Sequence, residues 1–144
     1  MGFFKKLFGG HTGLELVDSE LGKFDSDYVK GENVTWVGSA RLFGSTIELL
    51  MDGSPDNISQ RQKQIVLNAL ANEDLLKSES SFAISNEYSN ANMKFTSLSE
   101  QLEVKAITSN ANGFELSFEQ KESPHYYINV HFENNRQQGT SIDS

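Results

Sequence analysis

The pattern of hydrophobic and polar positions changes its period twice along the chain. Between residues 14 and 53 apolar positions alternate with polar ones, most clearly in residues 46–51, where Ile47, Leu49 and Met51 share one face. Successive side chains of a strand point to opposite sides, so a period of two predicts strands with one buried face. Turn signals at Gly22, Gly31 and Gly44 separate these segments. We therefore expect an antiparallel meander here.

The middle of the chain has the period of a helix. Ser54-Pro55-Asp56 combines a capping hydroxyl, a proline and an acid, which together predict a helix start. Apolar residues at helical spacing follow at Ile58, Ile65, Val66, Ala69 and Leu70. Residues 72–74 interrupt this helix, and a second one is predicted from Leu75, with Phe82 on its inner side. Two amphipathic helices need an apolar surface to cover, and the strands supply it.

The period of two returns at Leu102 and predicts the remaining strands. Residues 110–113 end in Asn112-Gly113, a signal for a hairpin loop. Ser123-Pro124 breaks the chain before a last strand, which we predict over residues 125–133. The fold class expected is α+β, an antiparallel sheet of about six strands with two central helices packed on one face.

The expected organisation is one domain with two short flanking segments. Residues 1–13 are predicted to be a flexible amphipathic segment, residues 14–133 a single α+β domain, and residues 134–144 a polar tail that frays. Phe4, Leu7 and Phe8 would share one side of a short helix in the first segment. That side could contact a membrane surface, a partner or the domain itself. The expected core is Leu16, Phe24, Trp36, Ile47, Leu49, Ile65, Leu70, Phe82, Leu102, Val104, Leu116, Phe118, Ile128 and Val130.

Composition narrows the classes of partner and chemistry. The 144 residues include 12 basic and 20 acidic side chains, for a formal net charge of −8, and no cysteine. The missing cysteine excludes disulfides, thiolate metal sites and a cysteine nucleophile. The negative charge opposes binding of nucleic acid and favours a basic partner. The apolar runs are too short for stable membrane insertion or a signal peptide, so we expect a cytoplasmic protein.

The residue spacing predicts no catalytic, cofactor-binding or metal site. The chain contains no Gly-x-Ser-x-Gly, no phosphate-binding glycine loop and no calcium-loop spacing. His125, His131 and Glu133 could in principle ligate a metal. However, residues six apart in an extended strand are separated by about 20 Å, too far for the two histidines to share an ion. We therefore expect no cofactor.

The face of the sheet away from the helices is the expected binding surface. In the last two predicted strands, polar residues alternate with the apolar positions assigned to the core. Such a surface of acids, an aromatic ring and histidines suits protein recognition. The predicted partner-binding residues are Glu115, Glu119, His125, Tyr127, His131 and Glu133.

Two short motifs carry a resemblance to a known group of proteins. Asp18, Leu21, Gly22 and Phe24 follow the pattern Asp-x-x-Leu-Gly-x-Phe, and Trp36-Val37-Gly38 follows aromatic-x-Gly. In these motifs the chain resembles an uncharacterised family of bacterial domains found among the immunity proteins of polymorphic-toxin systems. The resemblance implies a non-enzymatic protein that neutralises a toxin, and it carries no catalytic residues over to this chain.

The leading hypothesis is thus a non-enzymatic protein-binding domain, of the immunity type, with a basic toxin as its partner. The alternative is a hydrolase with a dispersed site that gathers a histidine with carboxylates or a serine. A histidine at hydrogen-bonding distance from an acid in the folded chain would favour that alternative.

Overall fold

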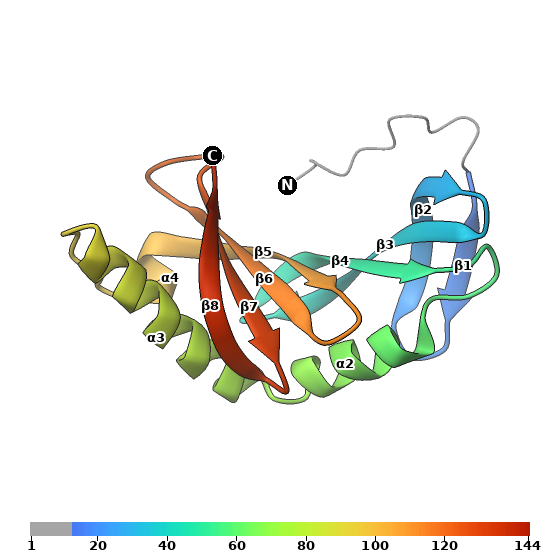
Figure 1. The fold of residues 1–144 in the computed structure, drawn as a ribbon, viewed down its shortest axis with the longest axis horizontal. Helices are drawn as coiled ribbons and strands as arrows, with labels where there is room; N and C mark the ends of the chain where they lie inside the picture. The colour runs from blue at the N-terminus through green and yellow to red at the C-terminus, as the bar shows by residue number, and fades with distance from the viewer. Residues whose placement is uncertain (1–12) are drawn as a thin grey trace.

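The computed structural model describes residues 13–144, and their strands form one mixed sheet in which strand order follows sequence order (Figure 1). The strands are β1 (Glu15–Asp18), β2 (Gly22–Lys30), β3 (Asn33–Leu42), β4 (Ser45–Gly53), β5 (Leu102–Ser109), β6 (Phe114–Gln120), β7 (Tyr127–Glu133) and β8 (Arg136–Asp143). The helices are α2 (Gln60–Leu70), α3 (Glu73–Asn90) and α4 (Leu98–Gln101). Figure 1 shows α2 and α3 along one side of the strongly twisted sheet.

The expected six-stranded antiparallel sheet is wrong in both strand number and direction. The sheet has eight strands, and β4 pairs with β5 in parallel, with Leu49 opposite Ile107. All other neighbouring strands are antiparallel. The helices that separate β4 from β5 carry the chain back along the sheet, which is the crossover that a parallel pair requires. Periodicity identifies strands but does not show in which direction a crossover returns.

The expected frayed tail is wrong as well, because residues 136–143 form β8. Its residues pair with β7, for example Thr140 with Val130. The Thr140 hydroxyl donates to Glu87 of α3 at 2.5 Å, and the Gln137 amide donates to Glu79 of α3 at 2.9 Å. The residues of β8 are mostly polar because β8 is an edge strand, and hydrogen bonds rather than apolar packing hold it to α3.

Two of the hairpins, β3–β4 and β7–β8, have loops of two residues with a left-handed backbone. Asn134 and Asn135, between β7 and β8, have φ of 51° and 60°. Phe43 and Gly44, between β3 and β4, have φ of 52° and 78°. Two successive left-handed residues match the twist of a hairpin, and asparagine adopts that conformation readily. The Asn-Asn pair was therefore an available signal for β8, whereas a phenylalanine at this position is uncommon.

The helix α2 begins at Gln60, later than the Ser54-Pro55-Asp56 signal predicts. The Ser54 amide donates to the Asn57 carbonyl at 2.8 Å, which folds residues 54–57 into a turn. Ser59 then caps the helix, with its hydroxyl accepting from the Gln62 amide at 3.2 Å. A serine hydroxyl does cap the helix, as expected, but it belongs to Ser59 and not to Ser54.

The orientation of α3 differs from the expectation at Phe82. Its buried residues include Leu76, Ala83, Ile84 and Tyr88, which follow helical spacing along one stripe. Phe82 lies outside that stripe and is 59% exposed. The expectation that Phe82 belongs to the core is wrong, because apolar residues occur on both sides of this helix.

The core lies between the sheet and the helices. Trp36, Leu49, Val104 and Ile128 of the expected core are all buried. Leu16, Ile65 and Leu70 are partly buried and pack against the same cluster. The remaining expected core residues, also buried, are Phe24, Ile47, Leu102, Leu116, Phe118 and Val130.

Two polar residues of α2, Gln62 and Lys63, are buried and bonded to several partners. The Gln62 carbonyl oxygen accepts from the Asp52 amide at 2.8 Å and from the Ser109 hydroxyl at 2.7 Å, which ties β4 to β5. Lys63 bonds Asp18 at 3.0 Å and Glu20 at 2.9 Å. Desolvation tends to raise the pKa of Asp18, but hydrogen bonds from the backbone and from Lys63 lower it below its ordinary value. Buried polar groups with this many partners fix one arrangement of α2 on the sheet.

The expected amphipathic segment of residues 1–13 lies outside the described residues except for Gly13. Within residues 13–144, none of the helices has the length and hydrophobicity needed to cross a membrane.

Candidate functional site

The candidate site is the side of β4–β8 opposite the helices, which we call the open face. Alternation along each strand assigns residues to it, because the intervening residues are buried against the helices. Its charged side chains include several carboxylates and one lysine. They are Glu48 on β4, Glu103 and Lys105 on β5, Glu115 and Glu119 on β6, Glu133 on β7 and Asp143 on β8.

Glu115, His131 and Ser141 form a row of polar contacts across β6, β7 and β8, and the first two were predicted from the sequence. The strand register places Glu115 opposite His131. Glu115 Oε2 lies 3.3 Å from His131 Nδ1, and His131 Nε2 lies 3.0 Å from Ser141 Oγ. The His131 side chain is 41% exposed and that of Glu115 is 31% exposed. The order acid–imidazole–hydroxyl is that of a serine nucleophile with its base, but here it lies on an open surface.

A second cluster surrounds Lys105. Its Nζ lies 2.7 Å from Glu103 and 3.7 Å from Glu119. A bulge in β5 between Val104 and Ala106 inserts Lys105 as the extra residue and turns it towards these acids. The hydrogen bond to Glu103 raises the pKa of Lys105 above its ordinary value. This lysine is therefore cationic at neutral pH and neutralises part of the surrounding negative charge.

Glu119 is held ionised by several donors. The backbone N–H of His125 donates to it at 2.9 Å, and this bond is the main cause of its lowered pKa. Lys105 and a hydrogen bond with Tyr127 lower the pKa of Glu119 further. Burial and the neighbouring carboxylate raise the pKa of Tyr127. Glu119 and Tyr127 thus lie together, as the sequence predicts for alternate positions of paired strands.

The other predicted site residues lie apart from these clusters. His125 is not in a strand, because β7 begins at Tyr127; it sits in the preceding turn with φ of 69°. Its ring therefore does not continue the row of His131, although its amide orders Glu119. Glu133 lies at the exposed end of β7, next to the hairpin loop. The strand assignment of His125 was wrong because the turn after Pro124 extends further than periodicity indicates.

Sequence reasoning missed five residues of the open face, namely Glu103 and Lys105 described above, together with Glu48, Ser141 and Asp143. Ser141 and Asp143 were assigned to a frayed tail, but the register places Ser141 opposite Asn129. The Asn129 amide nitrogen donates to Asp143 at 2.7 Å. Glu48 lies between Ser39 and Ala106 on the adjacent strands, and its Oε1 is buried without a hydrogen-bond partner. Along β4 and β8 the sequence signal is the alternation of side chains between the two faces. That alternation does not distinguish an acid with a function from an acid that is only solvated.

The arrangement is suited to binding a cationic surface more than to holding a metal. The carboxylates are spread over five strands, and Lys105 pairs with two of them, Glu103 and Glu119. Within residues 13–144, the His, Asp and Glu side chains do not form a group of three that could hold a metal ion. Hydrogen bonds already fix the orientation of Glu119 and Asp143, so these two carboxylates are preorganised.

Comparisons of this chain with protein-family models, with curated proteins and with solved structures found no match.

Proposed function

We propose that this protein is a non-enzymatic, cytoplasmic binding protein of the immunity type, which neutralises a basic toxin by covering it with the open face. The observation that carries the proposal is the charge of that face. Its carboxylates surround one lysine, in a chain whose formal net charge is −8. The partner is therefore a protein with a basic surface, and nucleic acid is repelled by the same field.

The physical mechanism is electrostatic steering followed by occlusion. A face with one sign of charge raises the rate of encounter with an oppositely charged partner, and this effect weakens as salt screens the field. The carboxylates bonded to His125, Tyr127 and Asn129 keep their orientation before binding. Less ordering of side chains is then required when the partner docks. The resemblance of residues 18–24 and 36–38 to immunity-type domains supports the biological role.

The test reverses the charge of the open face. We expect the Glu115→Lys, Glu119→Lys double variant to bind cytochrome c, a small basic protein used as the probe, about tenfold to a hundredfold more weakly at low salt. A Glu32→Lys, Asp56→Lys double variant changes the net charge equally at exposed positions outside the open face. It should retain most of the wild-type affinity. The measurement is a titration by isothermal calorimetry at several salt concentrations.

Because Lys105 and His131 lie beside the reversed positions, the reversal could also disturb folding. The Glu115→Gln, Glu119→Gln variant removes the charge without creating repulsion and should show the same loss in smaller measure. Circular dichroism establishes that each variant is folded. Equal affinity of wild type and of both folded open-face variants would contradict the proposal. For the immunity role, co-expression with a toxin encoded beside this gene should restore growth in the wild type but not in the charge-reversed variant.

The row Glu115–His131–Ser141 favours one second candidate, a serine hydrolase acting on small esters. In that reaction Ser141 Oγ attacks the ester carbonyl while His131 Nε2, 3.0 Å away, takes its proton. The C–O bond to the alcohol breaks, His131 returns the proton to the alcohol, and water then hydrolyses the acyl-serine. The exposure of these side chains argues against strong activity, since water competes for every charge that forms.

Hydrolysis of p-nitrophenyl acetate separates the two candidates. If the row is catalytic, Ser141→Ala should lower the rate about a hundredfold or more, and His131→Gln should do the same. The Ser39→Ala variant, on the exposed part of β3, serves as the control. A rate unchanged in Ser141→Ala would exclude the hydrolase and leave the binding function.

A further inference from the structure

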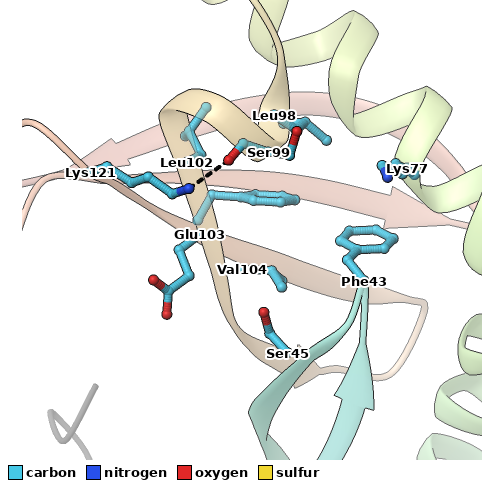
Figure 2. A pocket seen from close by; sticks show the side chains of 10 residues that line it. Phe43, Ser45, Lys77, Leu98, Ser99, Leu102, Glu103, Val104 and Lys121 are labelled. Carbon is cyan, nitrogen blue, oxygen red and sulfur yellow. Dashed lines mark hydrogen bonds between the residues drawn. The ribbon is translucent and has the colours of Figure 1, made fainter.

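A pocket of about 220 Å³ lies on the helix side of the sheet, where the tip of the β3–β4 hairpin meets α3, α4 and β5 (Figure 2). Its apolar lining residues belong to the buried side of the strands, and it borders the open face at Glu103. The lining includes Phe43, Leu98, Val104 and Phe118. Phe43 and Phe118 have nearly parallel rings with centroids 6.4 Å apart. An apolar lining with aromatic rings is typical of small-molecule sites.

The backbone at Phe43 is held in an unfavourable conformation at this pocket. Its φ of 52° lies in the left-handed region, which a bulky side chain rarely adopts. The amide of Phe43 donates to the carboxylate of Glu73 at the start of α3, which fixes the hairpin tip. Asparagine or glycine would adopt this conformation more easily. Strain of this kind is often found where a side chain serves a ligand.

The polar lining of the pocket is cationic, in contrast to the rest of the molecule. Lys77 from α3 and Lys121 after β6 both line it, and Figure 2 shows them well apart, with Lys77 near Phe43 and Lys121 near Ser99. Among residues 13–144, neither lysine has a carboxylate within ion-pair distance. Lys121 donates one hydrogen bond to the Ser99 carbonyl at 2.5 Å. An ammonium has three donors, so both lysines retain donors for an anion.

The acid that also lines the pocket does not cancel this charge. Glu103 is ion-paired with Lys105 at 2.7 Å. In Figure 2 its carboxylate points away from the rings of the pocket. The pocket therefore presents an apolar floor and two lysines in a chain of net charge −8. An acidic ligand would be neutralised here and repelled elsewhere on the surface.

We propose that this pocket binds a small aromatic carboxylate, with its ring against Phe43, which is only partly buried, and its carboxylate bonded to one of the two flanking lysines, Lys77 or Lys121. The volume sets the size of the ligand. A cavity of about 150 Å³ accepts benzene, so about 220 Å³ suits one ring with a carboxylate and excludes a long acyl chain. Charge-assisted hydrogen bonds to the carboxylate supply the preference for an acid over a neutral ring.

The test uses benzoate as the probe and the full-length protein. We expect benzoate to shift the amide signals of Phe43, Lys77 and Phe118 in a saturable way in ¹H–¹⁵N NMR spectra. Benzyl alcohol, which has the ring without the charge, should bind about tenfold more weakly. The Lys77→Gln, Lys121→Gln variant should lose about tenfold or more in benzoate affinity. Lys30→Gln, the same type of substitution at an exposed position on β2, should bind as the wild type.

A variant of Phe43, the residue with the left-handed backbone, gives a second and independent test. Phe43→Asn removes the ring and fits the left-handed backbone, so it should raise the midpoint of thermal unfolding while abolishing benzoate binding. A ring held only for structural reasons would instead lower the midpoint when it is removed. The proposal is overturned if benzoate gives no saturable shifts at these residues up to about 10 mM. It is equally overturned if benzoate binds the double lysine variant as tightly as the wild type.

Discussion

Replacing Trp36 with alanine should lower the free energy of unfolding by about 3–5 kcal/mol, because the largest buried side chain of the described residues would leave a cavity. The indole is fully buried on β3, opposite Met51 of β4. Its Nε1 donates to the Ser54 carbonyl at 3.0 Å, in the turn that precedes α2. Trp36 therefore joins the sheet to the start of the helical segment. Urea unfolding followed by circular dichroism measures the change.

Two further variants separate the contributions of the ring. Trp36→Phe keeps most of the apolar contact but leaves the Ser54 carbonyl without its donor, so we expect a smaller loss of about 1–3 kcal/mol. Phe82→Ala removes an equally aromatic but 59% exposed side chain and should cost less than about 0.5 kcal/mol. If Trp36→Ala cost no more than Phe82→Ala, Trp36 would not be the centre of the core and would better suit an exposed binding anchor.

Replacing Gly113 with alanine should destabilise the fold by about 3 kcal/mol. A Cβ atom at this position would lie 1.9 Å from the backbone oxygen of Phe132 and 3.2 Å from the Cα of Glu133. Neither atom can move away as a flexible side chain could, so β6 and β7 would have to separate at this end. The separation would also disturb the stacked rings of Phe114 and Phe132, whose centroids are 4.9 Å apart.

Hydrogen exchange should localise the effect of Gly113→Ala. We expect amide protection to fall first at the end of β6 and β7 that contains Phe114 and Phe132. Ala111→Ser changes an exposed residue of the same loop and should leave the free energy of unfolding within about 0.5 kcal/mol of the wild type. Protection and stability at wild-type levels in Gly113→Ala would show that the two strands approach less closely than the structure indicates.

Gly113 also shows how a sequence signal can be right for a different reason. The pair Asn112-Gly113 predicts a hairpin loop, and a loop is found there. The usual reason for glycine in such a pair is a left-handed backbone, but Gly113 is not among the residues with positive φ. The glycine is needed instead because the backbone of β7 passes close to it. That approach depends on residues nearly twenty positions away and has no local signature.

The candidate site was predictable in part. Alternation placed Glu115, Glu119, Tyr127 and His131 on one face, and the register of β6 and β7 then pairs Glu115 with His131 and Glu119 with Tyr127. The same alternation could not include Ser141, because β8 shows no apolar pattern to distinguish a strand from a polar tail. Lys105 reaches Glu119 through a bulge, which shifts the alternation by one residue.

From the sequence alone, the buried faces of the central strands and the net polarity of the surface were predictable. Residues such as Leu49, Phe118 and Ile128 share the apolar side of their strands because a period of two places them there, and that alternation is a local property of the sequence. The acidic charge and the missing cysteine are likewise set by composition. These properties require no knowledge of which segments meet.

The tertiary structure alone decided the direction of β5, the inclusion of β8 and the partners of the polar residues. The parallel pairing of β4 with β5 depends on how α2 and α3 return across the sheet, and Gln62 holds that pairing through Asp52 and Ser109. Likewise, the hydroxyl of Ser141 reaches His131 only because three strands are in register. Hydrogen bonds and ion pairs are short-ranged and directional, so their partners are chosen only after hydrophobic burial has brought distant segments together.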